Sequence, residues 1–459
     1  MKSIIGKNDN KMDNNSNSKK NDNFLKINQL QYMPKNICKN EDTTIIQEDY
    51  FIINSSSDID LLFDKTKNVI TSENDPAEKS FYLKFFEFIK IIGKHQNSAE
   101  FIKELSDHIF ISGGTDNKLT IYDSNYNTIK NQKFSDWVYN VNEKDKKRNF
   151  IQIIICSNDK TSLNRINLNN YNLYPIKELK EGSSFCILFN KDKILCFKPN
   201  YLSPIQFSFS KVINFSNKYF FKTSSKAGIK INNYYYAFTS NKIISGGKDA
   251  LYFGNILTKE IVYEIKGFSF IYTGNGLSLI SSKENKNKLL LCACKKYISG
   301  QKNGILLVNI QSEEKIKISY KFYNTNNFEV YCFCPIFVIK KNNNIFEENK
   351  IKTKTDYFLV GGFESNKSKG IIKLYKIIYN KNFSKNKIEF IQNVAINNNN
   401  NFKGFKGPIS SIIQSSKGDI IITSWDKNIY LFKPINIEYF LFYDKKNIKN
   451  DKKINIINI

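Results

Sequence analysis

Two short segments far apart in the chain share one pattern of residues. Residues 112–123 read SGGTDNKLTIYD, and residues 423–433 read TSWDKNIYLFK. In each segment a turn that holds an aspartate separates two strand-like runs, and the second run has an aromatic residue near its end. Aspartate and asparagine favour such turns because their side chains hydrogen-bond to the backbone just beyond them. The pattern therefore predicts the same β-hairpin near both ends of a folded region.

The residues between these two hairpins also indicate β-structure. Short runs rich in Ile, Val, Phe and Tyr alternate with Gly, Asn and Asp turn residues, and a helical period is weak throughout. The runs group into seven units, at roughly 52 residues per unit between Asp116 and Asp426. Polar insertions at 341–355, 364–370 and 397–401 lengthen some units, and we expect them to form loops. The predicted fold class is all-β.

The hairpin pattern resembles the closing half of a WD40 repeat, the sequence unit that forms one blade of a β-propeller. The Gly-His dipeptide that opens such a repeat has a counterpart in Gly93-Lys94-His95, with 26 residues between His95 and Tyr122-Asp123. Here Lys94 interrupts the dipeptide, and Tyr122 stands where the family has Trp. The resemblance implies a single propeller of seven four-stranded blades. Six or eight blades stay open as alternatives, because the third unit is poorly resolved in the sequence.

The resemblance also implies a buried hydrogen-bond network within a blade. In the family this network joins a His, a strand Ser or Thr, a turn Asp and the Trp, and it rigidifies the blade only when every member is paired. Its members here would be His95, Ser112, Asp116 and Tyr122 in the first unit, and Ser424 and Asp426 in the last. In the last unit Phe432 takes the aromatic place and no His precedes it. The expected role of these residues is structural.

A propeller needs a strand that closes the ring, because an open seam would expose strand edges. Residues 81–92, FYLKFFEFIKII, directly precede Gly93 and would supply the outermost strand of the last blade. Residues 437–443 could fill the same place, and an amphipathic helix is the alternative for 81–92. We expect closure by the N-terminal segment.

Composition divides the chain into four parts. Residues 1–45 are dominated by Asn, Lys, Asp and Ser, and they hold too few apolar side chains to offset the entropy of ordering, so we expect a disordered tail. Residues 46–80 form an irregular lead-in, and 81–443 form the propeller. Residues 444–459 are a second tail, rich in Lys and Asn.

The net charge of +26 raises the question of a polyanionic partner. Nearly all of the basic excess is Lys, with Arg148 and Arg165 the chain's two arginines, and the lysines are dispersed. Specific recognition of phosphates and bases favours the bidentate fork of Arg. We therefore expect other proteins as partners of a monomeric propeller within a complex. Binding of nucleic acid or acidic lipid by surface lysines is the alternative.

Catalytic chemistry has few candidate residues. The chain has two histidines, His95 and His108, which leaves little material for acid–base or metal sites. The pairs Cys292/Cys294 and Cys332/Cys334 have a spacing that places both thiols on one face of a strand, so we expect buried free thiols. No catalytic, cofactor or metal site is expected. With no signal peptide and no long apolar run in the sequence, we expect a non-enzymatic scaffold in the cytoplasm, with the nucleus as the alternative.

Overall fold

The chain divides into two units, residues 1–62 and 63–459, and the computed structural model describes residues of the second unit alone. The described residues are 69–71, 81–180, 182–188, 193–197, 205–208, 212–213, 223–224, 227–242, 249–258, 260–270, 275–281, 288–297, 301–311, 316–340, 351–380, 382–397 and 402–434. Strands dominate these residues. The helical segments among them are three short 3₁₀ turns: η1 (Ser106–His108), η2 (Ser365–Lys367) and η3 (Phe383–Lys385).

Within the described residues the strands form seven sheets. The first contains β3 (Ala99–Glu104), β4 (Phe110–Gly114), β5 (Lys118–Tyr122) and β6 (Thr128–Lys133). The second contains β7 (Val138–Lys147), β8 (Phe150–Ser157), β9 (Thr161–Asn167) and β10 (Leu173–Leu179). The third contains β11 (Phe185–Leu188), β12 (Lys193–Phe197), β13 (Ile205–Ser208) and β14 (Val212–Ile213).

In the next three sheets, as in the first three, strands pair antiparallel with their neighbours. The fourth contains β15 (Thr223–Ser224), β16 (Gly228–Lys230), β17 (Tyr235–Lys242), β18 (Ala250–Asn255) and β19 (Ile261–Lys266). The fifth contains β20 (Phe268–Phe270), β21 (Leu277–Ser281), β22 (Lys288–Tyr297), β23 (Gln301–Gln311) and β24 (Lys317–Asn326). The sixth contains β25 (Phe328–Lys340), β26 (Ile351–Glu364), β27 (Lys369–Ile378) and β28 (Lys387–Asn393).

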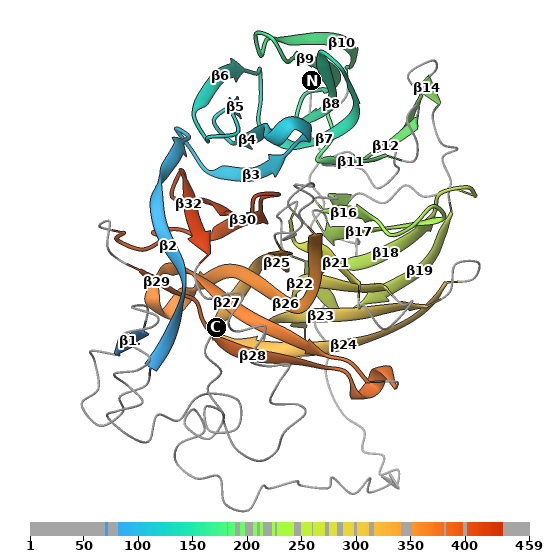
Figure 1. Cartoon of the computed structure of the whole chain (residues 1–459). Helices are drawn as coiled ribbons and strands as arrows, with labels where there is room; N and C mark the ends of the chain where they lie inside the picture. The colour runs from blue at the N-terminus through green and yellow to red at the C-terminus, as the bar shows by residue number, and fades with distance from the viewer. Residues whose placement is uncertain are drawn as a thin grey trace, which may run out of the picture. The chain divides into compact units, whose positions relative to one another are not determined.

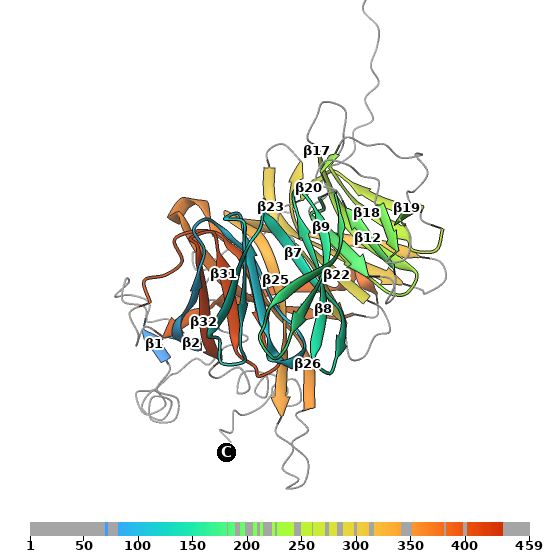
Figure 2. The same cartoon turned by 90° about the horizontal axis from the view of Figure 1, so that it is seen from above.

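The seventh sheet combines the two ends of the described chain. Its strands are β30 (Ile409–Gln414), β31 (Ile420–Ser424), β32 (Asn428–Pro434), β2 (Phe81–Lys94), β1 (Val69–Thr71) and β29 (Ala395–Asn397). β2 pairs antiparallel with β32, so that Phe88 faces Phe432 and Lys94 faces Asn428. The blue strand β2 lies beside the red strand β32 in Figure 1, and Figure 2 shows the same neighbours from above. Residues 81–94 are therefore a strand, and closure by the N-terminal segment is confirmed.

The sheets are arranged in a ring. One strand of each sheet contacts its counterpart in the next, in the cyclic order β3, β7, β11, β16, β21, β25, β30 and back to β3. Apolar side chains of facing sheets fill the space between them. Ile111 and Ile121 of the first sheet, for example, pack with Val141 and Ile153 of the second, and all four are fully buried. This arrangement is a β-propeller, and the expected all-β propeller is confirmed.

Several expectations concern residues that the structure does not describe. The tails 1–45 and 444–459 and the alternative closing segment 437–443 lie outside the described residues. Of the lead-in 46–80, the described part is β1. The boundaries of these parts stay predictions.

Removing a buried ring from the closing strand should destabilise the whole ring. Phe86 is fully buried, and its ring centroid lies 6.2 Å from that of Phe432 across the closing pair. We expect Phe86→Ala to lower the free energy of unfolding by about 3–5 kcal/mol, the usual loss for a buried Phe. Ile91→Ala, at a 49% exposed position of the same strand, should cost less than about 1 kcal/mol. Urea denaturation would measure both, and equal losses would contradict the packing described for β2.

Candidate functional site

The residues assigned to a network in the first unit lie within hydrogen-bonding distance of one another. His95 Nδ1 is 2.9 Å from Asp116 Oδ1, and His95 Nε2 is 3.0 Å from Ser112 Oγ. Ser112 Oγ is 3.1 Å from the hydroxyl oxygen of Tyr122. His95 follows directly after β2, Ser112 and Tyr122 belong to β4 and β5, and Asp116 lies in the turn between them. The closing strand thus delivers one member of the network into the first sheet.

The partners of each polar atom indicate how the protons are arranged. In the tautomer with the proton on Nδ1, His95 donates to Asp116, and Nε2 accepts from the Ser112 hydroxyl. The Tyr122 hydroxyl then donates to Ser112 Oγ. The side chains of His95, Ser112 and Tyr122 are buried, and in this arrangement each of their polar atoms has a partner. Four side chains therefore form one continuous chain of hydrogen bonds.

The carboxylate of Asp116 also organises the backbone of its turn. It accepts hydrogen bonds from the backbone N–H of Gln96 at 2.8 Å and of Lys118 at 3.2 Å. Burial of the carboxyl raises its pKa, but the hydrogen bonds from His95, Gln96 and Lys118 favour the charged form and outweigh this effect. The pKa of Asp116 consequently lies below the ordinary value. Asn117 adopts a positive φ of 62°, a conformation that Asn tolerates well.

Gly93 makes room for the tyrosine of the network. A Cβ atom on Gly93 would lie 2.2 Å from the Tyr122 hydroxyl oxygen and 3.0 Å from the ring carbon that carries it. Glycine at this position therefore allows the tyrosine to reach Ser112 beneath the closing strand. Burial raises the pKa of Tyr122 to about 12, so the hydroxyl stays protonated and can donate at neutral pH.

The corresponding turn of the seventh sheet uses the same backbone pattern with different side chains. Asp426 accepts hydrogen bonds from the backbone N–H of Lys406 at 3.0 Å and of Asn428 at 3.1 Å, as Asp116 does from Gln96 and Lys118. The third partner of Asp426 is the hydroxyl of Tyr430, at 2.7 Å. Since Lys406 corresponds to Gln96, the residue in the place of His95 is Phe405. Burial and the bond to Asp426 both raise the pKa of Tyr430.

Strand register shows that Ser424 has a different position from Ser112. Ser112 faces Thr120 across the first hairpin, and in the last hairpin the residue at this position is Ile422, which faces Tyr430. Ser424 lies two residues further along, where its hydroxyl donates to the carbonyl oxygen of Gly407 at 3.1 Å. The structure thus brings together His95, Ser112, Asp116 and Tyr122, whereas Ser424 bonds to backbone groups, accepting from the N–H of Asp426 at 3.2 Å as well as donating to Gly407.

An aromatic cluster occupies the equivalent space in the seventh sheet. Its ring centroids lie 5.0–6.4 Å apart, and its members are Phe88, Phe402, Phe405, Tyr430 and Phe432. Sequence reasoning missed Phe405 and Tyr430. The available signal was an alignment of the two hairpins on their turn aspartates, which puts Tyr430 at the position of Thr120, across from the expected serine.

A third group of polar contacts joins the first and seventh sheets at the other ends of their strands. Glu104 accepts a hydrogen bond from the backbone N–H of Ser416 at 2.7 Å and another from the Ser416 hydroxyl. His108 Nδ1 lies 2.6 Å from the same hydroxyl oxygen and 3.1 Å from Glu104 Oε1. In a hydrolytic triad the serine and the carboxylate bond to opposite nitrogens of the ring, whereas here both contacts involve Nδ1. The contacts of this cluster are structural, and they join the first sheet to the seventh.

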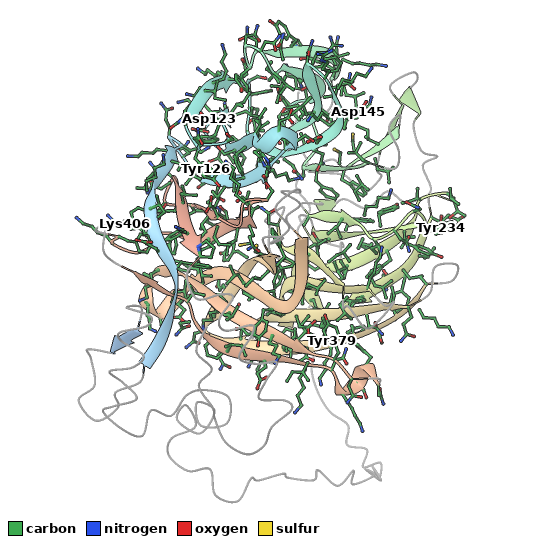
Figure 3. All side chains as sticks on the ribbon, viewed as in Figure 1. Asp123, Tyr126, Asp145, Tyr234, Tyr379 and Lys406 are labelled. Carbon is green, nitrogen blue, oxygen red and sulfur yellow. The ribbon has the colours of Figure 1, made fainter. Side chains whose placement is uncertain are left out.

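Tyr126 adds a longer-range contact to the same boundary. It lies just beyond β5, near Asp123, and both residues are labelled in Figure 3. Its hydroxyl donates to Asp419 Oδ2 at 2.6 Å, which joins the first sheet to the turn between β30 and β31. Burial and the bond to Asp419 both raise the pKa of Tyr126, so the donor stays protonated.

A candidate binding surface lies where the first two sheets meet. Trp137, directly before β7, is 44% exposed, and it contacts Tyr139 edge to face with ring centroids 6.2 Å apart. The carbonyl of Trp137 accepts a hydrogen bond from the N–H of Asn158 at 3.0 Å, and its own N–H donates to Asp136 at 2.7 Å. Sequence reasoning did not single out this segment, although Trp137 is one of the two tryptophans in the chain.

The thiols singled out from the sequence are part of the core. Cys292, Cys294, Cys332 and Cys334 are buried and free, and burial raises the pKa of Cys334 to about 12. Within the described ranges, no group of three or more His, Cys, Asp or Glu side chains is placed to hold a metal ion. In the same part of the chain, no helix is long and apolar enough to cross a membrane.

The ring of sheets places this chain in the class of β-propeller proteins. No family model and no curated protein matches its sequence. Solved structures similar to it include the WD40 repeats of RRP9, with a TM-score of 0.46, 8% identity and coverage of 76% of this chain and 99% of that one. The propeller of Dos1 has a TM-score of 0.43 at 11% identity, covering 80% and 81%. The WD40 propeller domain of Doa1 has 0.44 at 10% identity, covering 76% and 97%.

Replacing the turn aspartate should destabilise the first sheet in a pH-dependent way. Asp116→Asn should lower the free energy of unfolding by about 1–3 kcal/mol at pH 7, since it weakens bonds to a buried charged acceptor. Because the folded-state pKa of Asp116 is depressed, its contribution is fully present above the unfolded value of about 3.9 and is lost as pH falls through the folded value. Urea denaturation from pH 6 to pH 3 should therefore show a difference that is constant above about pH 5 and shrinks below about pH 4. A difference that grows on acidification would contradict this role.

Removing the hydroxyl of Tyr430 tests its bond to Asp426, which takes the place of the His95–Asp116 bond of the first sheet. Tyr430→Phe keeps the ring in the aromatic cluster but leaves Asp426 without the bond at 2.7 Å. We expect a loss of about 1–2 kcal/mol in the free energy of unfolding. Tyr320→Phe, at a 46% exposed position, is the matched control and should change it by less than about 0.5 kcal/mol. Identical melting curves for the two variants would show that the hydroxyl of Tyr430 is dispensable.

Proposed function

We propose that this protein is a non-enzymatic interaction scaffold, a monomeric propeller that binds other proteins within a larger complex. The observation that carries the proposal is Trp137, a large aromatic side chain that is 44% exposed on a segment with fixed backbone. Tryptophan is among the residue types enriched at the energetic centres of protein interfaces. A propeller by itself does not define a function, so the proposal depends on this surface.

The surroundings of Trp137 support its use as an anchor. Ser157 and Ser135 both donate to the Asp159 carboxylate, and the side-chain amide of Asn117 donates to the carbonyl of Ser135 at 3.2 Å. These bonds hold the segment before Trp137 between turns of the first and second sheets. A surface that is already ordered loses little conformational freedom on binding, which favours affinity.

The cysteines support a location inside the cell. Seven cysteines lie in the described part of the chain, and all seven are buried and free. Free thiols are typical of proteins in reducing compartments. We accordingly propose the cytoplasm as the place where the scaffold acts, with the nucleus as the alternative.

Capture of partners from native lysate with the full chain as bait would test the scaffold proposal. The lysate should be treated with nuclease, and the beads should be washed over a series of salt concentrations. We expect a defined set of proteins to remain after nuclease treatment and at moderate salt. Recovery of nucleic acid alone, lost steeply as salt rises, would contradict the proposal and point to binding by surface lysines.

A further inference from the structure

Two aromatic side chains lie beside the boundary between the first and second sheets, where Trp137 is exposed and Tyr139 is half-buried. Trp137 and Tyr139 flank Val138, which is fully buried among the apolar residues of the first two sheets. The register between β7 and β8 shifts between Val138 and Asn140, so strand alternation does not set the direction of Tyr139; its contact with the ring of Trp137 shows where it lies. Their rings meet at an interplanar angle of 85°. The pair therefore offers the exposed part of the Trp137 ring to a partner, with Tyr139 packed against it.

Carboxylates lie near this aromatic pair. Asp136 directly precedes Trp137 and holds the N–H of Trp137 at 2.7 Å through one oxygen and the side-chain amide of Asn158 at 2.7 Å through the other. Asp159 follows Asn158 in the turn between β8 and β9. Glu100 lies on β3 of the first sheet, which contacts β7, the strand that follows Trp137. Burial first, and then the charges of Asp136 and Glu100, raise the pKa of Tyr139 to about 12.

The charge at this place is opposite to that of the chain as a whole. The protein carries a net charge of +26, yet Asp136 bonds to the N–H of Trp137 and Asp159 lies in the neighbouring turn, next to a Lys160 that is paired with Glu178. A carboxylate oxygen has two lone pairs, so Asp136 can accept further bonds from a partner in addition to those it accepts from Trp137 and Asn158. The face of a tryptophan ring attracts a cation, most strongly when Arg or Lys stacks on it. Both features select the same kind of side chain.

We propose that the Trp137 patch, formed by Glu100, Asp136, Trp137, Tyr139 and Asp159, binds a segment rich in Arg or Lys on a partner protein. This inference rests on the proposed scaffold function and specifies the partner's chemistry. A basic side chain stacks on Trp137 and donates to Asp136 or Asp159. Nucleic acid and acidic lipid are unsuited to this patch, since their phosphates meet three carboxylates.

Fluorescence anisotropy of short labelled peptides would measure this binding with the full chain. The probe is a peptide that alternates Arg and Gly, and the matched control peptide alternates Glu and Gly. We expect the Arg peptide to bind and the Glu peptide to bind at least about tenfold more weakly. Trp137→Ala should weaken binding of the Arg peptide at least about fivefold, and Asp136→Asn and Glu100→Gln about two- to threefold each.

Tyr174→Ala provides the matched control variant. Tyr174 lies on β10 of the second sheet, is 46% exposed and faces Arg165 on β9. The substitution therefore removes a comparable aromatic side chain from outside the patch. The affinity of this variant for the Arg peptide should equal that of the unmodified protein. Equal affinities for the Trp137→Ala and Tyr174→Ala variants, with both melting temperatures unchanged, would overturn the inference.

Repeating the lysate capture with the Trp137→Ala variant separates the two proposals. Partners held by the unmodified protein and lost from this variant would support the patch, whereas partners held equally by both would refute the patch and leave the scaffold intact. A failure of both baits to retain any protein would refute the scaffold itself. Zero-length carbodiimide coupling then identifies the occupant. Links from Asp136 or Glu100 to lysines of a captured partner support the proposal, and links to lysines within residues 1–45 of this chain would overturn it.

Discussion

The antiparallel pairing of β2 with β32 is the interaction on which the rest of the structure depends. A ring of sheets without it would leave the outer edge of β32 unpaired, with backbone N–H and C=O groups exposed. The pair also affects the first sheet, because the chain leaves β2 at Lys94 and the next residue, His95, bonds to Ser112 and Asp116. The N–H of His95 also donates to the carbonyl of Lys427 at 2.8 Å, so one short segment bonds to both sheets. Closure and the rigidity of the first sheet are therefore properties of the same residues.

The turn aspartates of the first and seventh sheets are hydrogen-bonded by different side chains. Both turns hold an aspartate that accepts two backbone N–H groups, and both need a third partner for the carboxylate. The first sheet supplies an imidazole linked to a serine and a tyrosine. The seventh supplies the hydroxyl of Tyr430 and surrounds it with phenylalanine rings. A hydrogen-bond chain demands exact partners at each atom, whereas a cluster of rings tolerates small changes in spacing.

Local patterns in the sequence were sufficient for the architecture and for the residues close to a recognisable hairpin. The spacing of Gly93, His95 and the Ser112–Asp116 turn predicted side chains that do meet, because each lies at or beside a strand whose register the hairpin determines. Ser424 was placed by residue type, and register assigns its expected position to Ile422. The Trp137 patch could not be predicted in this way. Its members come from the loops and strands of two sheets, and their proximity depends on how those sheets pack.

During synthesis the closing strand β2 is made long before the strand with which it pairs. β2 is made early, but its partner β32 follows roughly 350 residues later, which at ordinary rates of translation is a delay of about 20–70 s. During this interval Phe86 and Phe88, buried in the finished ring, have no β32 to cover them. A nascent chain with two such rings beside an unpaired strand edge is a natural substrate for chaperones. The pairing that completes the ring thus leaves β2 without its partner until nearly the whole propeller has been made.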